Sequence, residues 1–239
     1  MLAWKTHVEG AVPELFFEDQ FENRTELVST DGDHGNIRIV AEGDVETLDT
    51  SGVFGPHKAF TPLWLFERDT ALTKPGKLVR ELVKSIEPGD DLKRLHALMS
   101  AINEKVEYKT GTTDAATPAE QALEIGSGVC QDHAHIFITG ARLMGFPARY
   151  VSGYLMTDDK TDQAASHAWA EAHVDALGWV GFDAANDVCP DEHYVRIATG
   201  LDYRDACPLS GMVTGIAAED MKVTIKVEQH GQSQSQSQS

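Results

Sequence analysis

Positive charge is scarce in this sequence of 239 residues, which has 20 lysine and arginine residues against 38 aspartate and glutamate residues and a net charge of −18. Nucleic acids and anionic membranes are bound through clustered basic side chains, so this balance argues against both partners. The glycines are scattered, and no glycine-rich motif for a nucleotide or dinucleotide occurs. We therefore expect no nucleic-acid partner, no membrane partner and no cofactor.

Long apolar runs and cysteines are also scarce. No apolar stretch approaches the roughly 20 residues that span a bilayer, and residues 1–10 lack the basic-then-apolar pattern of a signal peptide. The three cysteines, Cys130, Cys189 and Cys207, are too few for a disulfide scaffold, and their odd number leaves at least one thiol free. These absences predict a cytoplasmic protein in which one thiol is available for chemistry.

The patterning of the chain changes along its length. Hydrophobic residues make up 41% of it, as in globular proteins. Residues 1–65 fit β-structure with loops, because residues 36–40 alternate between polar and apolar side chains and residues 42–48 fit a further short strand. A linker is predicted between Gly52 and Pro62, where glycine and proline recur.

Helical periodicity replaces alternation after this linker. Apolar residues spaced by three and four predict helices over residues 78–86 and 92–106, and Asp90 or Asp91 is placed to cap the second one. The spacing in Thr117–Glu120 is that of a capping box and predicts a third, short helix.

A fourth helix is predicted to begin at Cys130 and to end before Gly145. Strand-like segments then follow at residues 149–155, 167–174 and 179–183. Because the helices precede the strands instead of alternating with them, we expect an α+β fold rather than repeated βαβ units.

Cys130 follows the glycine-containing turn at residues 126–129 and stands at the start of the fourth predicted helix. The unpaired N–H groups and the positive end of a helix dipole favour a thiolate, and the same N–H groups can hold an oxyanion. The alternative is a buried structural cysteine, because free cysteine is among the most buried residue types.

His167 begins one predicted strand and Asp183 ends the next. The midpoint of these two positions lies at 175, inside the turn Asp175–Gly178, so a hairpin brings both side chains together within a residue or two of register. A carboxylate can orient an imidazole, and the imidazole can activate a thiol. Cys130, His167 and Asp183 are therefore a candidate catalytic triad.

Four segments point to a family: GSGVCQDHAH (126–135), GFPARYVSGYL (145–155), HAWAE (167–171) and GWVGFD (178–183). In this order and spacing they resemble bacterial members of the transglutaminase-like superfamily, which are often described as proposed cysteine proteases. The resemblance covers about residues 66–215. It implies a papain-like α+β core, with helices packed on an antiparallel sheet, and a triad on Cys130, His167 and Asp183. The family often has Asp-Pro-Thr-Asn where this chain has Asp183-Ala-Ala-Asn186, which keeps the aspartate and the asparagine.

The resemblance also implies an all-β region before the catalytic domain. Residues 1–65 match the middle of such a region, so we expect a shortened β region. An alternating segment at residues 221–227 predicts one last strand. The predicted organisation is a β region at 1–65, a transglutaminase-like catalytic domain at 66–215, a C-terminal strand within 216–230, and a disordered Gln/Ser tail at 231–239.

The triad predicts acyl transfer on the amide bonds of a peptide or protein substrate. His167 takes the thiol proton, Asp183 fixes the imidazole, and Cys130 attacks the amide carbon to form a thioester. Water as the acceptor gives hydrolysis, whereas a second amine gives the crosslink of a protein-glutamine transglutaminase. Because bacterial members of the family resemble peptidases and amidases, we favour hydrolysis.

Three further residues are weaker candidates for binding the oxyanion or the substrate. The resemblance implies an aromatic residue upstream of the nucleophile, which fits Tyr108, while Trp169 and Asn186 lie next to the triad in sequence. A tyrosine packed at a helix end, a core tryptophan and a surface asparagine are the alternatives.

Two other hypotheses compete with the enzyme. The first is a non-catalytic module that holds peptides or proteins on the same fold, against which the intact triad argues. The second is a structural domain with a buried, inert Cys130. A metal site is not expected, because His133 and His135 are two residues apart and point to different faces of a helix.

Overall fold

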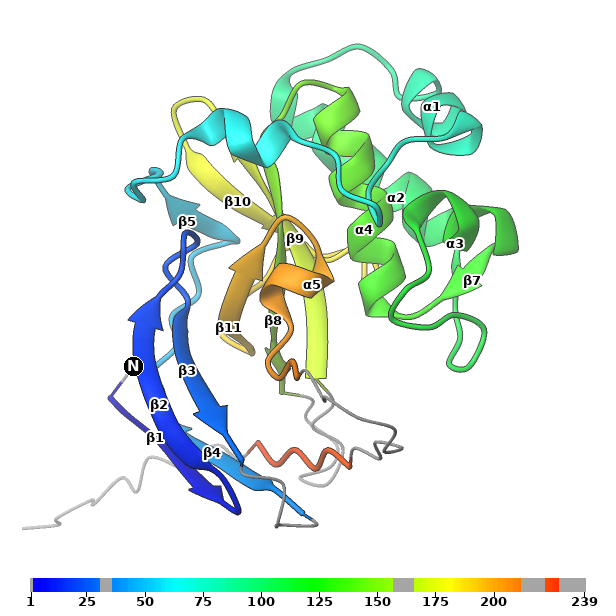
Figure 1. The fold of residues 1–239 in the computed structure, drawn as a ribbon. Coiled ribbons are helices and arrows are strands. Elements are labelled where there is room, and N and C mark those ends of the chain that lie inside the picture. Colours follow the sequence, from blue (N-terminus) through cyan, green and yellow to red (C-terminus); the bar gives the residue numbers. More distant parts are fainter. Residues whose placement is uncertain (1, 31–35, 157–165, 212–221, 228–239) are drawn as a thin grey trace, which may run out of the picture.

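The computed structural model describes residues 2–30, 36–156, 166–211 and 222–227. Its N-terminal β region consists of two antiparallel pairs, and the rest of the fold is an α+β core (Figure 1). The first pair joins β1 (Ala3–Glu9) to β4 (Arg38–Asp44), and the second joins β2 (Val12–Glu18) to β3 (Arg24–Ser29). The two short strands predicted at residues 36–40 and 42–48 are thus one strand, β4.

The core is built on a five-stranded antiparallel sheet in the order β11-β8-β9-β10-β5. Its strands are β5 (Val53–Gly55), β8 (Ala148–Leu155), β9 (Ser166–Val174), β10 (Gly178–Phe182) and β11 (Tyr194–Gly200). The helical elements are η1 (Leu63–Glu67), α1 (Lys77–Lys84), α2 (Asp91–Lys105), α3 (Ala119–Ile125), α4 (Cys130–Leu143) and α5 (Tyr203–Ala206). Helices packed against an antiparallel sheet confirm the predicted α+β class.

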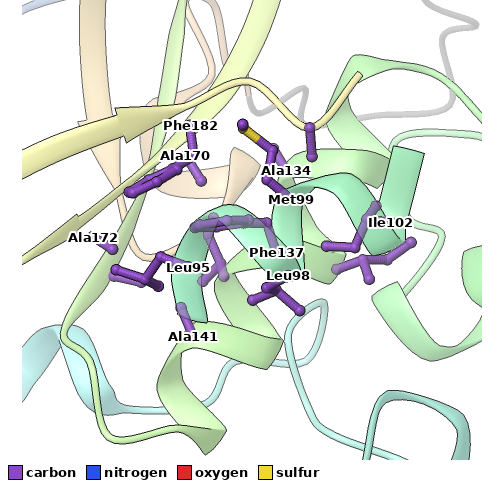
Figure 2. Packing of buried hydrophobic residues seen from close by; sticks show 14 of the residues in the cluster. Leu95, Leu98, Met99, Ile102, Ala134, Phe137, Ala141, Ala170, Ala172 and Phe182 are labelled. Carbon is purple, nitrogen blue, oxygen red and sulfur yellow. The ribbon is translucent and has the colours of Figure 1, made fainter. Parts of the chain in front are cut away.

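Helix α4 is the central element of the core, because the sheet packs on one side of it and α2 and α3 on the other (Figure 1). On β9, alternation directs three alanines, at positions 168, 170 and 172, into the core cluster. Small side chains there let α4 approach the strand closely. The Phe137 ring of α4 stacks on Phe182 of β10, with ring centroids 4.9 Å apart. Figure 2 shows Leu95, Leu98 and other α2 side chains packed around the same helix.

The helices predicted over residues 78–86 and 92–106 are confirmed, and Asp90 caps α2 by accepting the Lys93 N–H at 2.9 Å. The capping box predicted at Thr117–Glu120 is wrong. The Glu120 carboxylate instead accepts the N–H groups of Gly76, Leu78 and Val79 at the start of α1, at 3.1, 2.6 and 3.1 Å. Packing of α3 against α1 offers Glu120 three donors at the start of α1, whereas a capping box would offer it one.

Two further predictions fail at the ends of the core. The linker predicted between Gly52 and Pro62 contains β5, which pairs with β10 as an edge strand. Three residues are too few for alternation to reveal a strand. Residues 222–227 do not form a strand, although residues 221–227 alternate, because alternation needs a neighbouring strand to become a ladder. The tail at residues 231–239 lies outside the described residues.

The β region is attached to the core through the loop between β2 and β3. The side chain of Asn23 binds the backbone of Thr199 in β11 through two hydrogen bonds. Its Oδ1 accepts the Thr199 N–H at 2.8 Å, and its Nδ2 donates to the Thr199 carbonyl oxygen at 2.7 Å. Beside it, Phe21, Phe66 and Trp179 form a second buried cluster. The β region therefore rests on the sheet face opposite α4.

Replacement of Glu120 tests whether α3 holds the start of α1. We expect Glu120→Ala to lower the free energy of unfolding by about 2 kcal/mol, because three N–H groups lose their acceptor. The matched control is Glu124→Ala, which removes an exposed glutamate from the same helix. Urea denaturation measures both variants, and equal losses would show that Glu120 does not cap α1.

Candidate active site

Cys130 is the first residue of α4, and the chain before it is held on two sides. Strand β7 (Ser127–Gly128) pairs in parallel with β6 (Glu107–Tyr108). Asp132 Oδ2 accepts the Val129 N–H at 2.8 Å and the Thr113 hydroxyl at 2.6 Å. The turn is therefore rigid, and the N–H of Cys130 lies in the first helical turn, where N–H groups have no intrahelical acceptor.

His167 and Asp183 come together through the β9–β10 hairpin, which forms as predicted. In its register Gly178 pairs with Val174 and Phe182 with Ala170, so Asp183 continues β10 just past its end. His167 Nε2 lies 2.6 Å from Asp183 Oδ2. The two side chains are only 9% and 1% exposed, so little water competes for this contact.

The Asp183 carboxylate is surrounded by hydrogen-bond donors. Besides His167, its Oδ2 accepts Asn186 Nδ2 at 2.7 Å and the Tyr194 hydroxyl at 2.8 Å, and its Oδ1 accepts the Ala185 N–H at 3.0 Å. Burial would raise the pKa of Asp183, but the hydrogen bond and charge of His167 and the bonds from Asn186 and Tyr194 lower it. The carboxylate is therefore ionised despite its burial.

His167 stands between the carboxylate and the thiol. Burial lowers the pKa of His167, but side-chain hydrogen bonds with Asp183 and Cys130, together with their charges, outweigh it and raise the pKa to about 9. The ring also stacks on Trp169, with centroids 6.3 Å apart at 27°. At neutral pH the imidazole is thus held as a cation beside Cys130, an arrangement that can stabilise a thiolate.

Tyr194 is a site residue that sequence reasoning missed. It lies at the start of β11, and its ring meets the edges of both His167 and Trp169, with centroids 5.8 and 5.4 Å apart. Strand β11 pairs with β8 and not with β10, so the chain places it far from Asp183 in sheet order. No local motif marks this tyrosine, because the registers of β11 on β8 and of β8 on β9 bring it beside His167 and thereby to the carboxylate.

The three weaker candidates all lie near the candidate triad. Tyr108 is 54% exposed, and burial first, then the charges of Cys130 and Asp183, raises its pKa, so its hydroxyl stays a donor. Trp169 is 1% exposed, so it backs the His167 ring instead of forming an open wall. Asn186 is exposed, and its amide donates to Asp183.

Helix α2 supports the carboxylate from the other side. Asn103 Nδ2 donates to the carbonyl oxygens of Ala184 and Ala185 at 3.1 and 3.0 Å, which holds the turn after Asp183. His133 binds the carbonyl oxygens of Val129 and Val106, both at 2.9 Å, and thereby ties the start of α4 to the end of α2.

Neither His135 nor the surface acids belong to this site. His135 is buried, its Nε2 accepts the Tyr203 N–H at 3.2 Å, and burial lowers its pKa to about 4. Within the described ranges, the one cluster with metal-ligand spacing is Asp191–His193, in an acidic surface turn. Cys130, Cys189 and Cys207 are all free thiols.

The helices, the curled antiparallel sheet and a cysteine at a helix start define an α+β protein of the papain-like class. Residues 78–184 match the model of the transglutaminase-like superfamily. These residues therefore form a transglutaminase-like domain.

Two mycobacterial proteins are similar to this chain in sequence. An uncharacterized protein of Mycobacterium leprae is 36% identical over 174 residues, which cover 71% of this chain and 58% of that protein. An uncharacterized protein of Mycobacterium tuberculosis is 30% identical over 209 residues, covering 75% of this chain and 66% of its own length. The chain thus spans less than two thirds of these relatives.

A crystal structure of a proposed cysteine protease from Cytophaga hutchinsonii has the same fold. It superposes with a TM-score of 0.65 at 24% identity and covers 86% of this chain and 72% of its own.

In the part of the chain that the structure describes, no helix is long and apolar enough to cross a membrane.

Replacement of Tyr194 tests its hold on Asp183. Tyr194→Phe keeps the ring contacts but removes one of three donors to Oδ2, so the pKa of Asp183 rises. We expect the carboxylate ¹³C resonance of Asp183 to titrate about one pH unit higher in this variant, as loss of a charge-assisted hydrogen bond predicts. Tyr154→Phe, on the neighbouring strand β8, is the control and leaves the titration of Asp183 unchanged. An unchanged titration in Tyr194→Phe would remove Tyr194 from the site.

Proposed function

We propose that this protein is a thiol-dependent acyl-transfer enzyme that acts on amide bonds, as a peptidase or amidase. The observation that carries the proposal is the position of His167, which is bonded to Asp183 at 2.6 Å and interacts with Cys130 at the start of α4 strongly enough to help raise its own pKa. Nucleophile, base and orienting carboxylate are the parts that covalent catalysis by a thiol needs.

The acylation step follows from these positions. The Cys130 thiolate attacks the carbonyl carbon of the amide, and the electron pair of the C=O bond moves to oxygen. The Cys130 N–H and the Tyr108 hydroxyl are the donors to this oxyanion. The imidazolium of His167 then protonates the leaving amine as the C–N bond breaks, and a thioester remains on Cys130.

Deacylation uses the same residues in reverse. The neutral imidazole of His167 takes a proton from water, whose oxygen attacks the thioester, and the thiolate leaves with its electron pair. Asp183 keeps the imidazole oriented and stabilises its cationic form in both steps. We place this reaction in the cytoplasm, because a reducing compartment keeps the nucleophilic thiol of Cys130 from forming a disulfide.

Hydrolysis is favoured over amine transfer by comparison with the Cytophaga hutchinsonii protein, whose name describes a proposed cysteine protease. The substrate is therefore the amide bond of a peptide or protein.

The reactivity of Cys130 tests the thiolate–imidazolium pair. In a protein carrying Cys189→Ser and Cys207→Ser, we expect iodoacetamide to alkylate Cys130 rapidly at pH 6–7, well below the usual thiol pKa of about 8.5. His167→Ala is expected to slow this labelling at neutral pH by at least about tenfold, because the cation that stabilises the thiolate is lost. Labelling that follows an ordinary thiol curve in both proteins would overturn the proposed function.

The acceptor is tested on a peptide mixture, with and without a fluorescent primary amine. We expect new peptide termini or released ammonia, both lost in Cys130→Ala. Incorporation of the amine without hydrolysis would instead identify a transglutaminase, and unchanged peptides with a reactive Cys130 would contradict peptide hydrolysis.

A further inference from the structure

A cavity of about 370 Å³ lies between the β region and the sheet face opposite α4. Its walls come from the β2–β3 loop, from β5 and the residues after it, and from the strands β8, β10 and β11. Cys130, His167 and Asp183 are not among the described residues that line it. Its size falls within the range of about 300–1,000 Å³ that is typical of small-molecule sites.

Two arginines meet in this cavity on one buried carboxylate. Arg149 Nε lies 2.7 Å and its Nη2 2.5 Å from Glu171 Oε2, and Arg196 Nη1 lies 3.4 Å from Glu171 Oε1. Glu171 is fully buried, and Arg149 is 9% exposed. Arg149 lines the cavity and binds Glu171 through Nε and Nη2, so Nη1 is the nitrogen that can donate to a ligand.

The charges around the cavity do not balance. Lys58, Arg149 and Arg196 line it as cations, whereas Glu22 in the lining and the buried Glu171 are the acids. Three cations and two carboxylates leave one positive charge. Burial lowers the pKa of Arg149, and the charges of Glu171 and Glu22 oppose this effect. A further anion beside Arg149 would therefore stabilise the charged guanidinium.

Aromatic rings hold both guanidinium groups in place. The Arg149 guanidinium lies 4.1 Å from the Trp179 ring centroid, and that of Arg196 lies 5.4 Å from the Phe54 centroid. The Trp179 Nε1–H donates to His57 Nδ1 at 3.1 Å, which fixes the indole. Carboxylate and guanidinium match in geometry, so two held guanidinium groups suit a planar anion. Phe54, which is 41% exposed, adds an apolar surface beside them.

We propose that this cavity binds a small monocarboxylate with a flat apolar body, its carboxylate on Arg149 and Arg196 and its body against the Phe54 ring. One negative charge balances the cavity, and a carboxylate supplies it with the planar shape that a tetrahedral phosphate lacks. The site is separate from the thiol: Glu171 is four residues from His167 along β9, or about 13 Å in an extended strand. It therefore does not depend on the proposed acyl-transfer activity.

The test follows binding of 4-fluorobenzoate to the full chain by ¹⁹F NMR. We expect saturable binding that Arg196→Gln weakens at least about tenfold, because a charge-assisted hydrogen bond is lost. Arg196 is partly exposed and Arg149 keeps its own bonds to Glu171, so the variant is expected to fold, which thermal unfolding checks. Lys58→Gln, at an exposed position, is a second variant and weakens binding less.

Four controls define the site. Arg38→Gln, which removes an exposed arginine of the β region, leaves binding unchanged, and so does Cys130→Ala. The neutral 4-fluorobenzamide and inorganic phosphate do not compete. N-acetylphenylalanine represents a peptide C-terminus, and 4-fluorobenzoate represents a small free acid. The ligand that binds more tightly shows which of these two sources of carboxylate the cavity prefers.

Four results would overturn the proposal, and the first three concern the ligand and Arg196. These are the absence of saturable binding, an affinity for 4-fluorobenzoate that Arg196→Gln leaves unchanged, and competition by phosphate or the benzamide that is as strong as by unlabelled benzoate. Loss of binding in Cys130→Ala would place the anion at the thiol site instead.

Discussion

The buried carboxylate of Asp183 is the constraint around which the site is built. An ionised carboxylate is costly to bury unless donors replace the lost water, and here side-chain donors from three separate segments converge on one of its oxygens. That carboxylate in turn raises the pKa of His167, which carries the positive charge that the thiol needs. The reactivity proposed for Cys130 therefore depends on how well β9, the turn after β10 and β11 are held together.

Helix α4 holds these parts in register. Its N-terminal residue is Cys130, its buried face packs on the alanines of β9, and its C-terminal turn carries Arg142. The Arg142 guanidinium donates to the carbonyl oxygens of Phe66, Ala148 and Leu201 at 2.8 Å each. One buried side chain thereby joins η1, β8 and the end of β11, so the helix links the thiol to the strands that carry His167 and Tyr194.

The same face of β9 serves two different purposes. Alternation places His167, Trp169 and Glu171 on one side, while the alanines between them face α4. Trp169 is buried between the triad at one end and the arginine–glutamate cluster at the other. A single strand thus organises a candidate nucleophilic site and a separate cationic cavity, with an apolar residue to keep them apart.

The sequence by itself determined the helices, the α+β class and the hairpin that joins His167 to Asp183, because periodicity, caps and short turns are local signals. The position of Cys130 at the start of a helix could also be predicted from the sequence. Tyr194 beside Asp183, Glu120 on the start of α1, the edge strand β5 and the arginines over aromatic rings were decided only by the tertiary structure. Each joins segments that are distant in the chain or separated in the sheet, so sheet order and packing, which no local pattern encodes, selected the partners.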